Sequence, residues 1–110
     1  MNASRLERQE KLRTAVDAIV TPWPGVSRQS MFGCPSYVAD GVLFAVVSEQ
    51  GLSLTRLSDA QRVALDRSVP VEPFVAGGRT VQRWATVPVD TDSLDPVATA
   101  LRQSYDAAIV

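Results

Sequence analysis

The chain has 110 residues, which is enough for one domain with a single hydrophobic core, so we assign residues 1–110 to one domain. Apolar residues make up 45% and charged residues 21%, a composition that excludes wholesale disorder. The formal net charge is −1, which argues against direct binding to nucleic acid or to an anionic membrane. No apolar run is long enough to span a membrane, and the polar N-terminus does not have the pattern of a signal peptide, so we expect a cytoplasmic protein.

The first predicted element is a helix over residues 3–20. Its apolar residues recur with helical spacing and form one stripe, which consists of Leu12, Ala15, Val16, Ile19 and Val20. Charged residues crowd the first half, so we expect that end to be solvated. Pro22-Trp23-Pro24-Gly25 then ends the helix and turns the chain.

The middle of the chain predicts a β-meander. A strand over residues 31–39 meets a strand over 42–47 across Asp40-Gly41, a strong signal for a two-residue hairpin. The second run is apolar throughout, which is typical of a central strand covered on both faces. After a turn at Gln50-Gly51, Leu52 and Leu54 alternate with polar residues, which predicts a strand with one wet face.

The remaining elements are a short helix, a second hairpin and a final helix. Ser58 and Gln61 fit a capping box at the start of the short helix, which should end near residue 68 because of Pro70. Strands over residues 72–75 and 80–87 flank a Gly-rich turn, and Pro73 places the first of them at a sheet edge. Asp95 is the expected N-cap of the last helix, followed by proline at its first position.

The predicted order is α-β-β-β-α-β-β-α. Tight turns join consecutive strands, so we expect an α+β fold with a mostly antiparallel, five-stranded sheet. The helices should pack on this sheet, most simply on one face.

The sequence offers little material for catalysis. It contains no histidine and one cysteine, which excludes a Ser-His-Asp or Cys-His nucleophile system and a Cys/His zinc site within one chain. It also has no phosphate-binding glycine motif. The carboxylates of Asp90, Asp92 and Asp95 are the densest acidic cluster, and they fit helix capping better than a hard cation. We therefore predict no enzymatic activity and no cofactor.

Five residues are candidates for a binding site. Cys34 is the one soft nucleophile, and Arg28 is the nearest basic residue in the sequence that could lower its pKa. Arg79 and Arg83 lie on the second predicted hairpin with Trp84, where they could clamp an anion and a ring. The alternatives are an inert, half-buried cysteine, solvated arginines and a core tryptophan.

Two further aromatic residues, Trp23 and Phe32, could be partly exposed. An exposed aromatic pair would indicate a surface for a partner protein.

The middle and end of the chain resemble the TfoX N-terminal domain family. The resemblance covers roughly residues 28–108 and is carried by Ser30-Met31-Phe32-Gly33, Tyr37, Asp40-Gly41-Val42-Leu43-Phe44-Ala45, Leu52-Ser53-Leu54, Pro73-Phe74 and Gly78-Arg79. The family's Gly-Gly pair appears here as Gly33-Cys34, and its lysine-rich character is missing. The resemblance implies an α+β fold with an antiparallel sheet and implies no catalytic residues. Larger family members are linked to bacterial competence regulation; we expect this chain to be a short stand-alone member.

These observations predict a small regulatory or protein-interaction domain, with a protein partner or self-association. The alternative is a domain that binds a small anionic or nucleotide-like ligand through Arg79, Arg83 and Trp84.

Overall fold

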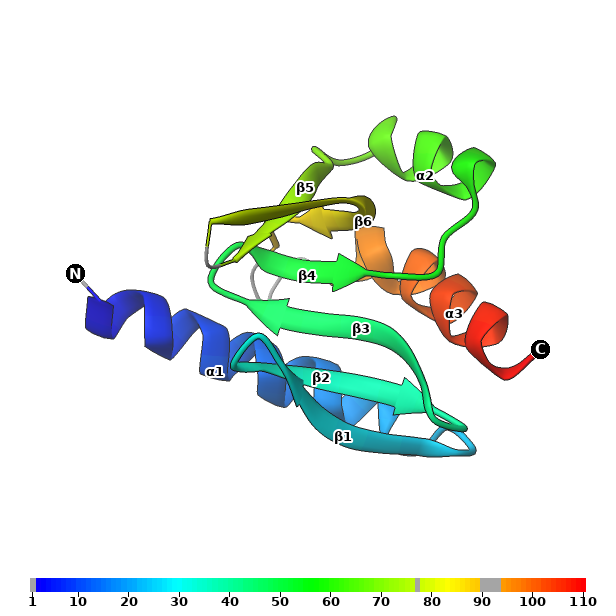
Figure 1. The fold of residues 1–110 in the computed structure, drawn as a ribbon, viewed down its shortest axis with the longest axis horizontal. Coiled ribbons are helices and arrows are strands. Elements are labelled where there is room, and N and C mark those ends of the chain that lie inside the picture. The colour runs from blue at the N-terminus through cyan, green and yellow to red at the C-terminus, as the bar shows by residue number, and fades with distance from the viewer. Residues whose placement is uncertain (1, 77, 90–93) are drawn as a thin grey trace.

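The computed structural model describes residues 2–76, 78–89 and 94–110 (Figure 1). Over these residues the chain forms three helices and one six-stranded sheet, in the predicted α+β class. The elements in chain order are α1 (Asn2–Val20), β1 (Val26–Met31), β2 (Cys34–Ala39), β3 (Val42–Ser48), β4 (Gly51–Leu54), α2 (Asp59–Asp66), β5 (Glu72–Ala76), β6 (Arg79–Val87) and α3 (Asp95–Ile109).

The sheet has the strand order β1-β2-β3-β4-β6-β5, and every neighbouring pair is antiparallel. The prediction of five strands was wrong, because residues 26–30 were not expected to form a strand and the strand expected over residues 31–39 begins only at Cys34. Phe32 and Gly33 both have positive φ, +55° and +74°, and form a two-residue turn between β1 and β2. This turn adds β1 to the sheet as an edge strand. The turn predicted at Asp40-Gly41 is confirmed, since Ala39 pairs with Val42 across it.

Helices α1 and α3 cover one face of the sheet, behind the strands in Figure 1. The predicted stripe of α1 is confirmed, since Leu12, Val16 and Val20 are buried and the charged residues of its first half that the structure describes are mostly exposed. Tyr105 of α3 donates a hydrogen bond to the carbonyl oxygen of Pro24 (2.6 Å), and its ring packs on Trp23. Contacts of this kind join both helices to one core. In the described part of the chain, no helix is long and apolar enough to cross a lipid bilayer.

The helix caps match the sequence at α2 and differ at α3. Ser58 and Gln61 form the predicted capping box, with the Gln61 amide on the Ser58 hydroxyl (3.1 Å) and the Ser58 amide on the Gln61 side chain (2.9 Å). The prediction of Asp95 as N-cap was wrong, because Leu94 precedes the helix and Asp95 is its first residue. Asp95 places a carboxylate in the first turn instead, where it complements the helix dipole. Asp90 and Asp92 lie outside the described residues.

The alternation of apolar and polar residues in β4 predicts that the sheet face away from α1 and α3 is exposed to solvent. The structure differs, because several residues on this face are buried. Ser36, Val46, Ser53 and Thr86 are all buried, although they point away from the two helices. They form a row across the sheet, because Ser36 pairs with Val46, Val46 with Ser53, and Ser53 with Thr86. The hydroxyl groups of Ser53 and Thr86 satisfy each other at 2.7 Å. This row of residues is therefore covered by a part of the molecule other than α1 and α3.

Candidate functional site

The two outer hairpins of the sheet meet in front of its central strands. Phe32 of the β1–β2 turn contacts Phe74 of β5 and Trp84 of β6, with ring centroids 5.8 and 6.0 Å apart, and Phe74 and Trp84 are 5.0 Å apart. The strands β1 and β5 are the opposite edges of the sheet. A contact between their hairpins requires the sheet to curl. This curl accounts for the burial of Ser36, Val46, Ser53 and Thr86 on the same face of the sheet. We call Phe32, Phe74 and Trp84 the aromatic cluster.

Phe32 is the exposed and strained member of this cluster. It retains 48% of its surface exposed, whereas Phe74 retains 1%. Its φ of +55° is unusual for a bulky residue and costs roughly 1–2 kcal/mol. Both central residues of a type I′ turn need positive φ, which is why asparagine, aspartate and glycine dominate there. Phenylalanine at this position is therefore not what the turn itself favours.

Trp84 reaches the cluster because β6 bulges away from β5. Pro73 of β5 pairs with Ala85 and the next residue, Phe74, pairs with Val81, so residues 82–84 of β6 have no opposite residue. Bulges of this kind redirect side chains and sharpen the local twist. The Arg62 guanidinium of α2 donates to the carbonyl oxygen of Gln82 in the bulge at 2.5 Å. The short helix thus stabilises the irregular segment that carries Trp84.

A second contact holds β5 in its curled position. The Gln50 carboxamide, in the β3–β4 turn, accepts a hydrogen bond from the Val75 amide (2.8 Å) and donates to the Pro73 carbonyl (3.4 Å). In the sheet order, β6 separates β5 from β4, so this contact exists only because the hairpin folds over the sheet. It also occupies backbone groups on the outer edge of β5. Together with Pro73, it protects this edge against pairing with another strand.

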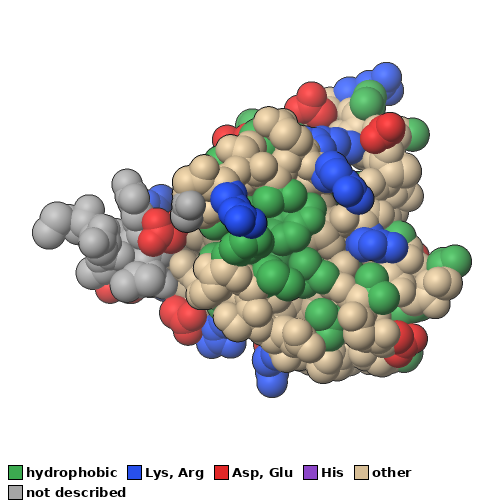
Figure 2. All heavy atoms as spheres, in the orientation of Figure 1, with side chains coloured by type: hydrophobic (Ala, Val, Ile, Leu, Met, Phe, Trp, Pro, Cys, Tyr) green, Lys and Arg blue, Asp and Glu red, His purple; other side chains and the backbone are tan. Residues whose placement is uncertain are grey.

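Figure 2 shows the face of the sheet that lies opposite α1 and α3. Hydrophobic side chains gather near the middle of this face, Lys and Arg side chains border them, and most Asp and Glu side chains lie farther out. An apolar surface rimmed by charged groups is typical of a binding surface.

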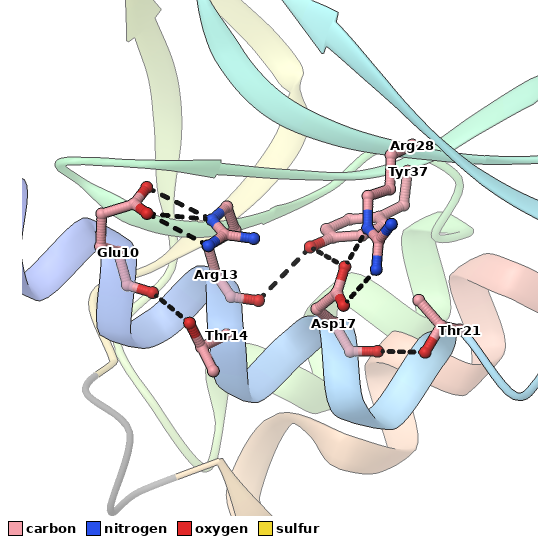
Figure 3. A network of polar contacts seen from close by, with 7 residues as sticks. All are labelled: Glu10, Arg13, Thr14, Asp17, Thr21, Arg28 and Tyr37. Carbon is pink, nitrogen blue, oxygen red and sulfur yellow. Dashed lines mark hydrogen bonds and ion pairs between the residues drawn. The ribbon is translucent and has the colours of Figure 1, made fainter.

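The structure does not bring Arg28 to this surface. Its guanidinium pairs with both carboxylate oxygens of Asp17 on α1, at 2.5 and 2.6 Å, and the Tyr37 hydroxyl also donates to that carboxylate at 3.2 Å (Figure 3). Arg28 holds the pKa of Asp17 below its ordinary value, and burial together with Asp17 raises the pKa of Tyr37. This network ties α1 to β1 and β2 on the other side of the sheet, so Arg28 neither activates Cys34 nor joins the cluster.

Cys34 lies beside the cluster, at the start of β2 and next to the Phe32–Gly33 turn. Its Sγ is 3.7 Å from the carbonyl oxygen of Phe32. Partial burial raises the pKa of the thiol, and the charge of Glu49 raises it further. A thiol with a raised pKa is protonated at neutral pH and is a poor nucleophile. The structure therefore favours the packing interpretation of Cys34.

Arg79 and Arg83 lie on β6 near the cluster, and both are exposed. Arg83 belongs to the bulge together with Trp84, and Arg79 begins the strand opposite Ala76. Within the described residues, neither guanidinium forms an ion pair. Arg79 and Arg83 therefore share a strand with Trp84, and Cys34 follows the turn that carries Phe32, whereas Arg28 is paired with Asp17 on α1.

The sequence indicates Phe32 only as a partly exposed aromatic residue, and it gives no sign that Phe74, Gln50 and Arg62 belong to this region. The turn at Phe32 and Gly33 could not be recognised from the sequence, because both residues have positive φ although Phe-Gly is not a common pair in such turns. Trp23 is partly exposed, as predicted, but its ring packs against Phe44 and Tyr105 at the edge of the main core and not against Phe32. A separate shallow hollow along α1, lined by Glu10, Lys11, Thr14 and Ala15, involves none of the predicted site residues.

The comparison with protein families agrees with the fold and with the resemblance seen in the sequence. Residues 18–108 match the model of the TfoX N-terminal domain, which is most of the chain. The chain belongs to the TfoX N-terminal domain family. No curated protein matches it. Within this TfoX N-terminal domain, the matched residues include the whole aromatic cluster, Gln50 and Arg62, so the surface described above is part of the family domain itself.

Proposed function

We propose that this domain is a regulatory protein-interaction module, that it contacts a partner protein through the aromatic cluster, and that it acts by binding and not by catalysis. The observation that carries the proposal is Phe32, which is half exposed in a turn whose conformation disfavours it. Backbone strain of this kind clusters at functional sites. Membership of the TfoX N-terminal domain family is consistent with a regulatory or interaction role.

The chemistry of the surface supports a protein partner. Energetically dominant contacts in protein interfaces are enriched in tryptophan, tyrosine and arginine, and the surrounding rim is polar. Here Arg79 and Arg83 are exposed on the same strand as Trp84, whose ring contacts the exposed ring of Phe32. Phe74 is buried beneath them and fixes their positions. A ring held in place before binding loses little conformational entropy when a partner covers it.

The alternative, a small ligand clamped by Arg79, Arg83 and Trp84, has weaker support. The Trp84 ring already contacts two other rings, at 5.0 and 6.0 Å, so part of its surface is not free to stack on a ligand. A ligand-sized site also normally encloses most of its ligand. Phe32, in contrast, is exposed at a turn, as expected of a side chain that enters a pocket on a partner.

The test is affinity capture from the native lysate with three baits: the natural domain, Phe32→Asn and Val63→Asn. Asparagine suits positive φ, so relief of about 1 kcal/mol of strain should roughly offset about 1 kcal/mol of lost ring contact. The melting temperature of Phe32→Asn should thus stay within about 5 °C of the natural domain.

Val63 on α2 is the matched control, since it is 54% exposed and lies outside the aromatic cluster. We expect a protein that the natural domain and Val63→Asn retain and that Phe32→Asn loses. Retention of the same proteins by all three baits would refute the proposal.

A further inference from the structure

The charges around the aromatic cluster narrow down the chemistry of the partner. Arg83 lies in the β6 bulge with Trp84, Arg79 lies on the same strand, and the Arg62 guanidinium is hydrogen-bonded to the bulge at Gln82. Figure 2 likewise shows Lys and Arg side chains at the border of the hydrophobic patch. Arg79 and Arg83 thus come from the strand that carries Trp84, and Arg62 comes from the helix that is bonded to its bulge.

These positive charges are not neutralised within the described part of the domain. The ion pairs there join Arg13 to Glu10, Arg28 to Asp17 and Arg102 to Asp106. All three lie on α1, α3 or the α1–β1 contact, away from the β6 bulge. Acidic residues thus pair with arginines on the helical side, while Arg62, Arg79 and Arg83 make no such pair.

Two acidic residues lie on the elements next to the cluster. Glu72 is an exposed residue of β5, and Glu49 lies near Cys34, where its charge contributes to the raised pKa of the thiol. Glu49 already takes part in an interaction within the molecule. The α2 helix that supplies Arg62 also carries Asp59 and Asp66, so the inference depends on Arg79 and Arg83 of β6, which are exposed and form no ion pair with a described residue.

We infer that the partner presents an acidic segment that also carries an apolar side chain, with the apolar group on Phe32 and Trp84 and the carboxylates on Arg79 and Arg83. The inference rests on the proposed function and adds the class of partner to it. Complementary charge at the rim of an interface steers association and selects the partner. Gln50 occupies backbone groups at the β5 edge, so the segment docks through its side chains and not as an added strand of β5.

The experiment measures the binding of three short fluorescent peptides to the natural domain by anisotropy. The first alternates Asp or Glu with Leu or Phe, the second replaces each acidic residue by Lys, and the third replaces each apolar residue by Ala. We expect the first peptide to bind at least about tenfold more tightly than the other two. Its affinity should fall as the salt concentration rises from about 0.01 M to about 0.15 M, because the Debye length falls from about 30 to about 8 Å.

Two double variants test the role of the arginines. Arg79→Glu/Arg83→Glu should weaken binding of the first peptide about tenfold, which is the sum expected of a few surface charge contacts. Arg8→Glu/Lys11→Glu makes the same change of net charge on α1, which packs on the other face of the sheet, and should leave the affinity unchanged. Circular dichroism would establish that both variants fold.

The outcomes separate the two proposals. The acidic partner is refuted if the Lys peptide binds as tightly as the acidic one, or if Arg79→Glu/Arg83→Glu binds the acidic peptide as tightly as the natural domain does. In that case, loss of peptide binding in Phe32→Asn would still support the interaction surface. If the acidic and Ala peptides bind equally and Phe32→Asn has no effect, charge alone drives binding and both proposals fail. Absence of binding by the first peptide, or tighter binding of a single-stranded oligonucleotide of equal charge, also overturns the inference.

Discussion

At the scale of single residues, Phe32 and Asp17 have opposite effects on the stability of the domain. Phe32 occupies a conformation that its own turn disfavours, and half of its ring faces solvent. Asp17 is the opposite case, because its carboxylate accepts bonds from both Arg28 and Tyr37 and connects α1 to two strands. The first arrangement costs stability and offers a contact, whereas the second provides stability. Only the second depends on a charge that pH can remove.

We expect the stability of the domain to depend on the ionisation of Asp17. Its folded-state pKa lies below the ordinary 3.8 because Arg28 stabilises the carboxylate. The stabilisation is present above about pH 4 and is lost as pH falls through the lowered pKa. Asp17→Asn should therefore be less stable than the natural domain at pH 7, and the difference should shrink below pH 4. Urea unfolding at several pH values measures this, and a pH-independent difference would contradict it.

At the scale of elements, sequence patterns predicted most of the helices and hairpins. The apolar stripe of α1, the capping box of α2 and the Asp40-Gly41 turn are local signals, and all three are confirmed. The break between β1 and β2 was missed, because Phe32 is not a residue type that type I′ turns favour at the first central position. The bulge in β6 was missed too. Its support comes from Arg62 and from packing against Phe32, which are distant in sequence.

The candidate site was only partly predictable, because some of its residues are close in the sequence and others are distant. Arg79, Arg83 and Trp84 are close in sequence and could be grouped by inspection. Phe32 and Phe74 join them only through the curl of the sheet, which no local pattern encodes. Arg28 was grouped with Cys34 because they are near in sequence, although β1 turns its guanidinium to α1.

The Gln50 contact makes a prediction about the β5–β6 hairpin. In Gln50→Ala the Val75 amide loses its acceptor, and the hairpin loses one of the contacts that fold it over the sheet. One hydrogen bond contributes about 1 kcal/mol, so exchange of the Val75 amide hydrogen should accelerate about fivefold. The Leu54 amide, in the buried strand β4, is the internal control and should keep its rate. Unchanged exchange at Val75 would show that Gln50 does not hold the hairpin.

At the scale of the whole molecule, the two faces of the sheet are covered in different ways. The helical side holds the main core, in which Tyr105 and Trp23 connect α3 to the turn after α1. The other side is covered by the two outer hairpins, which meet over a row of small buried residues. Small side chains such as Ser36, Val46 and Ser53 leave room for the aromatic rings above them. The curl of the sheet thus builds the surface that we propose to be the site of contact.

The most direct test of the proposed interaction surface is photo-crosslinking in the native cell. A photoreactive phenylalanine analogue, p-benzoylphenylalanine, replaces Phe32 in one variant and Val63 in another, which compares the cluster with an equally exposed site on α2. We expect a discrete crosslinked protein from position 32 and none of that identity from position 63. The same crosslinked products from both positions, or none from position 32, would contradict the claim that the aromatic cluster contacts a partner protein.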